Sequence, residues 1–165
     1  MKRLILLLTI LGIVFSCAAC GGQEEGNCVF YYLRSDSTIQ YGQTDALIAP
    51  VERELSVQEV PLDDLLQLYL DGSSDEAFRN PCPKGTYLLS TIPKEDVLVV
   101  VLSREFSTLD GIQLSLAGAC LTATCHALTD CEAIQVRSGE NVYDFNLKDF
   151  VFLDETAGKQ GKDTL

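Results

Sequence analysis

Val97-Leu98-Val99-Val100-Val101-Leu102 is a continuous apolar run of strand length in the second half of the chain. A strand that is covered on both faces has such a sequence, whereas a strand with one face in water alternates apolar and polar residues. The run therefore predicts a central strand of a sheet, covered on both faces. This strand is the element around which we arrange the others.

A long helix is expected after this strand. Ser107 or Thr108 can cap it, Asp110 lies in its first turn, and the helical pattern reaches about Leu128. Apolar and small side chains occupy most sides of this helix, so we expect it to be buried against the sheet.

Two strands and a shorter helix are predicted before the central strand. Residues 28–34 are aromatic and β-branched, and residues 46–55 follow as a second strand of an antiparallel pair. Pro50 cannot donate to a ladder and places that second strand at an edge. Leucine spacing after Pro61 predicts a helix that ends at Gly72.

The rest of the chain predicts a loop and a hairpin. Residues 71–90 are rich in turn-forming residues and indicate a long loop. Residues 133–137 and 142–145 alternate around a turn at residues 138–141 and indicate a β-hairpin. We therefore expect an α+β fold: a mixed, mostly antiparallel sheet of about five strands with two helices packed on one face.

The N-terminus has the features of a secretory signal. Lys2 and Arg3 precede an apolar run over residues 4–15, which is too short to span a bilayer comfortably, and small residues then end at a cysteine. This arrangement resembles the bacterial lipobox, in which a cysteine receives a diacylglyceryl group and becomes the mature N-terminus. The resemblance implies a lipid-anchored protein on the extracytoplasmic face of the cell membrane.

Two cysteines fit the lipidation position. Val14 and Ser16 stand at the expected positions before Cys17, whereas Cys20 has a cysteine three residues before it, so we favour Cys17. The alternatives are an ordinary signal peptide cut near Ala19 and a retained N-terminal anchor helix.

Composition bounds the organisation and the partners. The signal spans residues 1–20, residues 21–27 predict a flexible tether, residues 28–153 have single-domain length, and residues 154–165 form a polar tail. The net charge of the chain is −12, and loss of the two basic residues with the signal makes it −14. Nucleic acid is excluded as a partner on this ground, and adhesion to anionic lipid or wall polymer is disfavoured.

The globular segment is similar to the GerMN domain of sporulation and spore-germination lipoproteins from about Phe30 to Phe145. The similarity rests on the closing hairpin and on four motifs, which are Tyr69-Leu70-Asp71-Gly72, Ser90-Thr91-Ile92-Pro93, Leu102-Ser103-Arg104-Glu105-Phe106 and Leu121-Thr122-Ala123-Thr124. It implies an extracytoplasmic module that is related to the ring-building domains of secretion-like assemblies and has no recognised catalytic residues. Its partners would be envelope or membrane proteins, with self-association as a further expectation. The chain departs from the best-studied arrangement, since it carries one such domain where that has two in tandem, and its cysteine content is unusual.

Cysteines offer a disulfide framework. If Cys17 is lipidated, an even number remains outside the cytoplasm, and the candidates besides Cys20 are Cys28, Cys82, Cys120, Cys125 and Cys131. Cys120 and Cys125 cannot readily pair with each other along one helix. Cys82 lies between two prolines and Cys131 follows the helix, so these two are better placed to meet partners. The other reading of Cys120 and Cys125 is that they are small buried apolar residues.

Catalytic and metal-binding patterns are weak. His126 follows Cys125 directly and points away from it on a helix, so the two cannot form a nucleophile and base. A zinc site that used His126 with the neighbouring cysteines would lack paired CxxC spacing. The acidic residues 71–76 lack the glycine and the terminal glutamate of a calcium loop. Ser103 and Glu105 have no histidine base near them in the sequence.

We therefore expect no enzyme, metal or cofactor, and two function classes remain. In the first, the domain is an interaction module that docks on another envelope protein through a sheet edge or an exposed face. In the second, it is an envelope lipoprotein that binds or hydrolyses peptidoglycan, or binds a small ligand. An apolar patch without a pocket would favour the first, and a pocket with convergent polar groups near residues 71–76 or His126 would favour the second.

Overall fold

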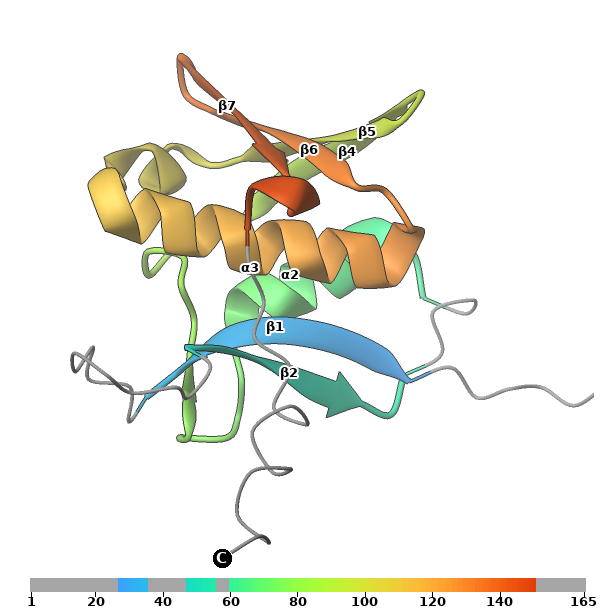
Figure 1. The fold of residues 1–165 in the computed structure, drawn as a ribbon, viewed down its shortest axis with the longest axis vertical. Coiled ribbons are helices and arrows are strands. Elements are labelled where there is room, and N and C mark those ends of the chain that lie inside the picture. The colour runs from blue at the N-terminus through green and yellow to red at the C-terminus, as the bar shows by residue number, and fades with distance from the viewer. Residues whose placement is uncertain (1–26, 36–46, 56–59, 151–165) are drawn as a thin grey trace, which may run out of the picture.

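The computed structural model describes residues 27–35, 47–55 and 60–150 (Figure 1). The candidate lipidation sites Cys17 and Cys20 and nearly all of the tether lie outside the described residues, as does the polar tail. The elements are β1 (Cys28–Arg34), β2 (Ile48–Arg53), α2 (Leu62–Asp71), β3 (Phe78–Arg79), β4 (Leu88–Lys94), β5 (Val97–Leu102), η1 (Arg104–Thr108), α3 (Gly111–Thr129), β6 (Ala133–Ser138), β7 (Asn141–Asn146) and η2 (Leu147–Asp149).

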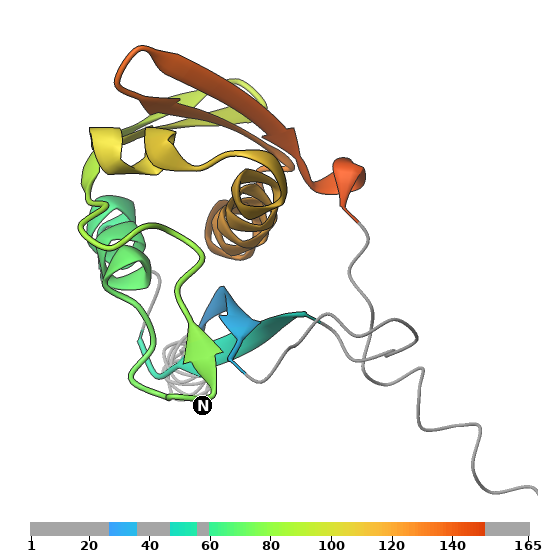
Figure 2. The ribbon, with the colours of Figure 1, turned by 90° about the vertical axis from the view of Figure 1, so that its left-hand side faces the viewer.

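Two sheets enclose a layer of helices. One sheet has three strands in the order β2-β1-β3, and the other has four in the order β4-β5-β6-β7. Figures 1 and 2 show α2 and α3 lying side by side between the sheets. The α+β class, the two helices and the mostly antiparallel pairing are confirmed, whereas the strands are somewhat more numerous than five and form two sheets in place of one.

The composition of α3 explains the second sheet. The nine consecutive residues from Ala117 to Cys125 are all buried, so every side of the helix in this stretch needs cover. A single sheet can cover only one side. Strand β1 packs on one side of α3, and β6 and β7 pack on another (Figure 1).

A glycine sets the distance between α3 and β7. A Cβ atom added at Gly118 would lie 2.3 Å from Cε1 of Phe145, which is far inside van der Waals contact. The ring of Phe145 therefore lies directly over the helix backbone. Gly118 costs helix propensity but permits this close approach.

A threonine of α3 covers the open edge of β1. Strand β3 pairs only with Leu33 and Arg34, so the rest of that edge has no strand partner among the described residues. The Tyr31 N–H donates there to Thr124 Oγ1 at 2.9 Å. A helix side chain thus takes the place of a neighbouring strand and satisfies a backbone donor at the edge.

Two stacked tyrosines fill the space between β1 and α2. The rings of Tyr32 and Tyr69 are 5.1 Å apart at an interplanar angle of 21°. The Tyr32 hydroxyl donates to the Tyr69 carbonyl at 3.0 Å. The Tyr69 hydroxyl is also buried, and it has no hydrogen-bond partner within the described part of the chain. Burial raises the pKa of both phenols.

Most elements lie where the sequence placed them, with three differences. The region predicted as a long loop contains the short strand β3 and leads directly into β4, which was not predicted. Helix α3 begins at Gly111, because Ser107 and Thr108 belong to the 3-10 helix η1 and Asp110 precedes the first turn of α3. Strand β4 was not predicted because it lacks the regular alternation of a strand: it lies at an edge, has a bulge after Leu88 and contains Pro93.

Replacing Thr124 with valine is expected to destabilise the protein by about 1 kcal/mol, because the partly buried hydrogen bond from the Tyr31 N–H to the threonine hydroxyl would be lost. Thr122→Val is the matched control. Thr122 is equally buried, but its hydroxyl donates only to the Gly118 carbonyl of its own helix. Urea unfolding of both variants measures the difference, and equal costs would show that Thr124 does not serve the edge.

The two tyrosines are expected to respond differently to loss of the hydroxyl. Tyr32→Phe removes a buried hydrogen bond and should cost about 1 kcal/mol, whereas Tyr69→Phe removes an unpartnered buried hydroxyl and should be neutral or stabilising. Thermal and urea unfolding of the two variants, which differ from the parent by one oxygen each, provide the comparison. A larger cost for Tyr69→Phe would contradict the assigned hydrogen bonding.

Candidate functional site

The four-stranded sheet has one face against the helices and one face directed away from them. In β5, Leu98, Val100 and Leu102 belong to the buried core. Because side chains alternate along a strand, Val97, Val99 and Val101 point to the other face. We call this other side the outer sheet face; it is defined by Ser90, Ile92, Lys94, Val97, Val99, Val101, Ala133, Gln135, Arg137, Val142, Asp144 and Asn146.

The half of this face on β4 and β5 is apolar except for Ser90 and Lys94. Ile92 lies opposite Val99, and Ser90 lies opposite Val101. Ile92 is 49% exposed and, nearby in the same strand, Leu89 is 56% exposed. Ile92 is thus in contact with solvent on a face that also contains the half-buried Val97 and Val101, whereas Val99 between them is only 3% exposed. Exposed apolar side chains that gather on one face are typical of interaction sites.

The half of this face on β6 and β7 is polar and internally ordered. Arg137 Nε and Nη2 donate to Gln135 Oε1 at 3.0 and 2.8 Å. Gln135 Nε2 in turn donates to Asp144 Oδ1 at 2.9 Å. The guanidinium is therefore held in one orientation beside the apolar half. An ordered arginine beside exposed aliphatic residues matches the composition of protein interfaces.

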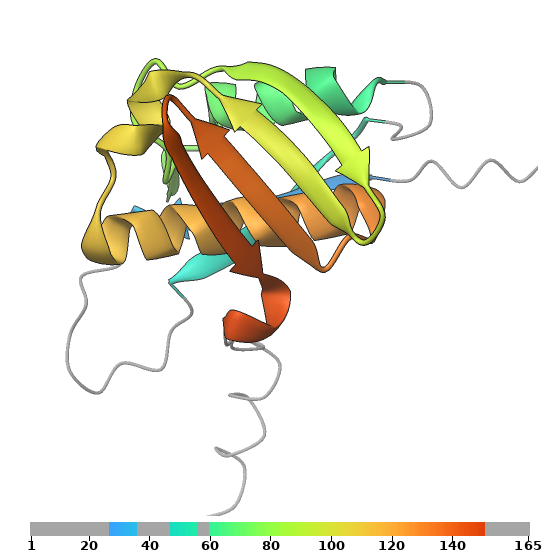
Figure 3. The ribbon, with the colours of Figure 1, turned by 90° about the horizontal axis from the view of Figure 1, so that it is seen from above.

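No described element lies over the outer sheet face, as the view in Figure 3 shows. The sequence predicted that the apolar run of β5 would be covered on both faces. Its central position is confirmed, since β5 lies between β4 and β6, but only the inner face is covered within the described residues. The apolar character of Val97 and Val101 is thus more than the described fold requires.

Helices occupy two of the sheet edges. The Leu88 N–H donates to Gln67 Oε1 at 2.9 Å, and Thr91 Oγ1 donates to Asp63 Oδ1 at 2.5 Å, so α2 runs along the edge of β4. The edge of β1 is covered by α3 as described above. An incoming strand would be obstructed at these two edges, whereas β2 and β7 each pair on one side only among the described residues.

The segment that leaves β5 uses its hydroxyls for structure. Ser103 is buried, its Oγ accepts the Tyr87 N–H at 3.1 Å, and it also hydrogen-bonds the Glu105 carboxylate, which lowers the pKa of Glu105. Ser138 Oγ donates to the Ser103 carbonyl at 2.7 Å and accepts the Ser107 N–H at 3.0 Å. These hydroxyls join β5, η1 and β6, and they are placed to hold the backbone.

A shallow groove of about 640 Å³ lies at the C-terminal end of α2, lined among others by Asp71, Asn80, Cys82, Lys84 and Thr86. The Asn80 side chain donates to the Leu70 carbonyl at 2.5 Å and accepts the Cys82 N–H at 2.9 Å, so its amide is committed to the loop. Burial raises the pKa of Cys82 to about 12, and a thiol with this pKa is protonated at neutral pH. The side-chain amide of Asn80 is thus used by the fold, whereas the buried Thr86 Oγ1 in the same lining has no hydrogen-bond partner within the described residues.

The acidic loop that follows α2 is also internally bonded. The Asp75 N–H donates to Ser73 Oγ at 3.1 Å, and Asp75 Oδ1 accepts the Ala77 N–H at 2.9 Å. The loop carboxylate therefore shapes a turn. Across the described residues, no group of three or more histidine, cysteine or acidic side chains is arranged to hold a metal ion.

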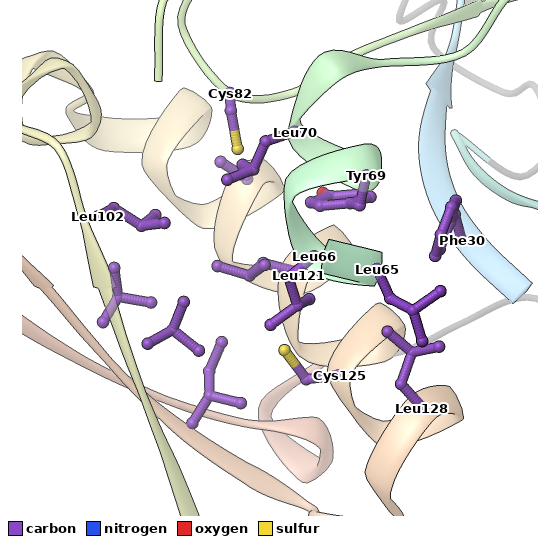
Figure 4. Packing of buried hydrophobic residues seen from close by; sticks show 14 of the residues in the cluster. Phe30, Leu65, Leu66, Tyr69, Leu70, Cys82, Leu102, Leu121, Cys125 and Leu128 are labelled. Carbon is purple, nitrogen blue, oxygen red and sulfur yellow. The ribbon is translucent and has the colours of Figure 1, made fainter. Parts of the chain in front are cut away.

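The five cysteines of the described residues carry free thiols, and four of them, Cys28, Cys82, Cys120 and Cys125, are buried. Figure 4 shows Cys82 and Cys125 among the side chains of the core. Cys131 is half-buried after the end of α3. The burial of Cys120 and Cys125 agrees with the interpretation that they are small apolar residues of the core. The disulfides among the candidate cysteines stay a prediction. His126 is partly buried near Glu132, whose pKa is lowered mainly by its ion pair with Lys148.

Sequence reasoning missed the outer sheet face. It did not identify β4, so the exposed Ile92 could not be assigned to a face, and it treated the apolar β5 as fully covered. The polar residues Gln135 and Arg137, on the strand that pairs with β5, could have indicated that one face of the sheet is uncovered. In a parallel neighbour of a doubly covered strand, alternate positions would be expected to be apolar as well.

A family model named Germane, described as sporulation and spore germination, matches residues 29–142. No curated protein matches the sequence at a significant level. A solved structure from Clostridium perfringens, provisionally described as a lipoprotein, is 18% identical with a TM-score of 0.38, over 79% of this chain and 95% of that chain. A likeness of this size supports no inference about function.

Proposed function

The chain belongs to the Germane family of sporulation and spore germination, and we propose that it is a lipid-anchored extracytoplasmic module that docks on another envelope protein. The observation that carries the proposal is the outer sheet face. Its apolar half has no cover among the described residues, and an ordered Arg137 lies beside it. The outer sheet face is the surface that we propose for the interaction with another envelope protein.

The chemistry of this face indicates the kind of surface that would fit it. Ile92, Val97 and Val101 favour an apolar partner surface, because burial of their exposed parts would contribute about 25 cal/mol per Å² of apolar area. Arg137 favours a carboxylate or carbonyl acceptor at the rim of that surface. Arg137 and Lys94 outnumber the one acid, Asp144, on this face, although the net charge of the chain is −12. We therefore propose a protein partner that has an apolar patch with acidic groups beside it.

The N-terminal sequence supports the anchor. One acyl chain holds a protein only marginally at a membrane, whereas two or more give stable anchoring. A diacylglyceryl group on Cys17 would supply two. The polar tether would then hold the domain away from the lipid surface, so that its sheet face is accessible to a neighbouring protein.

The anchor is tested by comparing Cys17→Ser with Cys20→Ser in cells that process lipoproteins. Cys17→Ser is expected to abolish lipidation and to release or misprocess the protein, because the thioether sulfur is lost. Cys20→Ser is expected to leave the lipid in place. Mass spectrometry of the mature N-terminus and membrane fractionation provide the measurement, and a fully lipidated Cys17→Ser protein would contradict the assignment.

The docking face is tested with two isoleucines that are exposed on different parts of the molecule. Ile92 lies on the outer sheet face at 49% exposure, and Ile112 lies at the start of α3 at 64% exposure. A photo-reactive amino acid at position 92 is expected to cross-link a defined envelope protein that position 112 does not reach. Ile92→Asp is then expected to weaken binding to that protein at least about tenfold, a loss of about 1.4 kcal/mol, with Ile112→Asp unchanged.

Folding must be equal in the two aspartate variants, and thermal unfolding checks it, since exposed substitutions usually change stability by less than about 0.5 kcal/mol. Equal binding by both variants would remove the outer sheet face from the proposal. Hydrolysis of wall fragments by the purified protein, without any cross-linked partner, would favour the envelope hydrolase as the alternative function.

A further inference from the structure

The groove at the C-terminal end of α2 is separate from the outer sheet face. Its volume of about 640 Å³ lies in the range of roughly 300–1,000 Å³ that is typical of small-molecule sites. Leu70 and Cys82 close it toward the core, since each is only 7% exposed and Figure 4 shows both among the buried side chains. None of the residues that line it belongs to the outer sheet face. The groove therefore needs an explanation of its own.

A tight turn forms one wall of the groove. The Thr86 N–H donates to the Pro83 carbonyl at 3.1 Å, and Gly85 between them has a φ of 87°, as the third residue of a type II turn requires. A Cβ atom placed on Gly85 would meet nothing within 4 Å, and Lys84 at the tip of the turn is exposed. A ligand in the groove can therefore lie directly against this turn.

One hydroxyl of this wall has no partner. Thr86 is 6% exposed, and its Oγ1 is buried without a hydrogen-bond partner within the described residues. The hydroxyl of Thr122, which is also buried, donates to a carbonyl of its own helix. A buried hydroxyl that makes no hydrogen bond is unfavourable, and such groups are uncommon in folded proteins. A hydroxyl or carbonyl of a ligand in the groove would supply the missing partner.

The charged side chains of the groove balance one another. Asp71 and Lys84 are the one acid and the one base among the described residues that line it. Gln67 Nε2 donates to Asp71 Oδ1 at 2.8 Å and so holds the carboxylate in place. Recognition of a phosphate or another polyanion relies on several cationic or N–H donors together, and a single lysine opposed by a carboxylate does not provide them. The lining favours a neutral ligand that has both hydrogen-bond donors and acceptors.

An exposed aromatic ring completes the lining. Tyr87 is 51% exposed, and such a ring can stack on the apolar face of a ligand while its hydroxyl bonds the rim of that ligand. A peptide fits this place less well, because extended peptides usually add to a strand edge. The edge N–H that follows Tyr87, that of Leu88, already donates to Gln67 Oε1 at 2.9 Å. A sugar ring has an apolar C–H face and a rim of hydroxyls, so it matches the aromatic ring and the polar groups together.

We propose that the groove binds a neutral saccharide, which stacks on Tyr87 and gives the Thr86 hydroxyl a hydrogen-bond partner. Asp71 accepts from hydroxyls of the sugar, and Lys84 donates to its oxygens. A soluble sugar and a strand of wall glycan share this chemistry. The site goes beyond the docking proposal and requires neither the partner protein nor the lipid anchor.

The site is tested by calorimetric titration of the purified full chain with cellotriose, maltotriose and chitotriose, in a detergent that has no sugar headgroup. Saturable binding of at least one trisaccharide is expected, with a dissociation constant of about 1 mM or tighter. Tyr87→Ala is expected to weaken this binding at least about tenfold, because the stacking ring is lost. Tyr87→Phe keeps the ring and is expected to weaken it by no more than about threefold.

Thr86→Val separates a binding role from a structural one. It is expected to weaken binding about fivefold through loss of one hydrogen bond, whereas the unfolding temperature of the sugar-free protein should not fall, because the hydroxyl has no partner there. Lys84→Ala is expected to weaken binding about fivefold as well, and its matched control Lys94→Ala, at an exposed lysine of the outer sheet face, should bind as the parent does.

Absence of binding to all three sugars, preferential binding of trialanine, or equal binding by Tyr87→Ala and the parent would overturn the proposal. Retention of the protein on isolated cell walls, released by the free trisaccharide, would identify a wall glycan as the source. Binding of the free sugar alone would identify a soluble one. Ile92→Asp is expected to bind saccharide as the parent does, so failure of the docking proposal and failure of the saccharide site are distinguishable.

Discussion

An α-helix that is apolar in every direction cannot rest on one sheet, because a sheet covers only the side on which it packs. Helix α3 is buried over nine consecutive residues, and the rest of the molecule is arranged to surround it. Gly118 lets the Phe145 ring lie against the helix backbone on one side, and Thr124 binds the edge of β1 on the other. The two sheets do not pair with each other in the described residues, so they are joined through the helices, by α3 and by α2, which contacts both β1 and β4.

Much of the fold follows from local sequence patterns. The part that was not predicted depends on which elements, far apart in the chain, pack over one another. The strand β1, the helix α2 and the hairpin of β6 and β7 were predictable because period and turn residues determine them locally. The division into two sheets was not, although the all-round apolar helix was recognised, because the sequence does not show how many layers will cover it. Strand β4 was missed since an edge strand with a bulge and Pro93 lacks regular alternation.

The candidate site was the least predictable feature. Exposure of an apolar strand face depends on whether anything packs over it, and a single sequence does not contain that information. The sequence did not favour chemistry at Ser103 or in the acidic loop that contains Asp75. In the structure the oxygens of Ser103 and Asp75 help to fix β5, η1 and a tight turn. Buried or loop polar groups in small domains are more often consumed by backbone donors than available to a substrate.

Alternation along β5 separates two kinds of selection in a single strand. Leu98, Val100 and Leu102 face the core, and their replacement would be felt as lost packing. Between them, Val97 and Val101 are half-buried on the outer sheet face, so their replacement would change that surface and leave the core contacts intact, whereas replacement of Val99, which is only 3% exposed, would also be felt as lost packing. If the outer sheet face is the docking surface proposed above, related chains could change partners through positions 97 and 101 at little cost in stability, but not through positions 98, 99, 100 and 102.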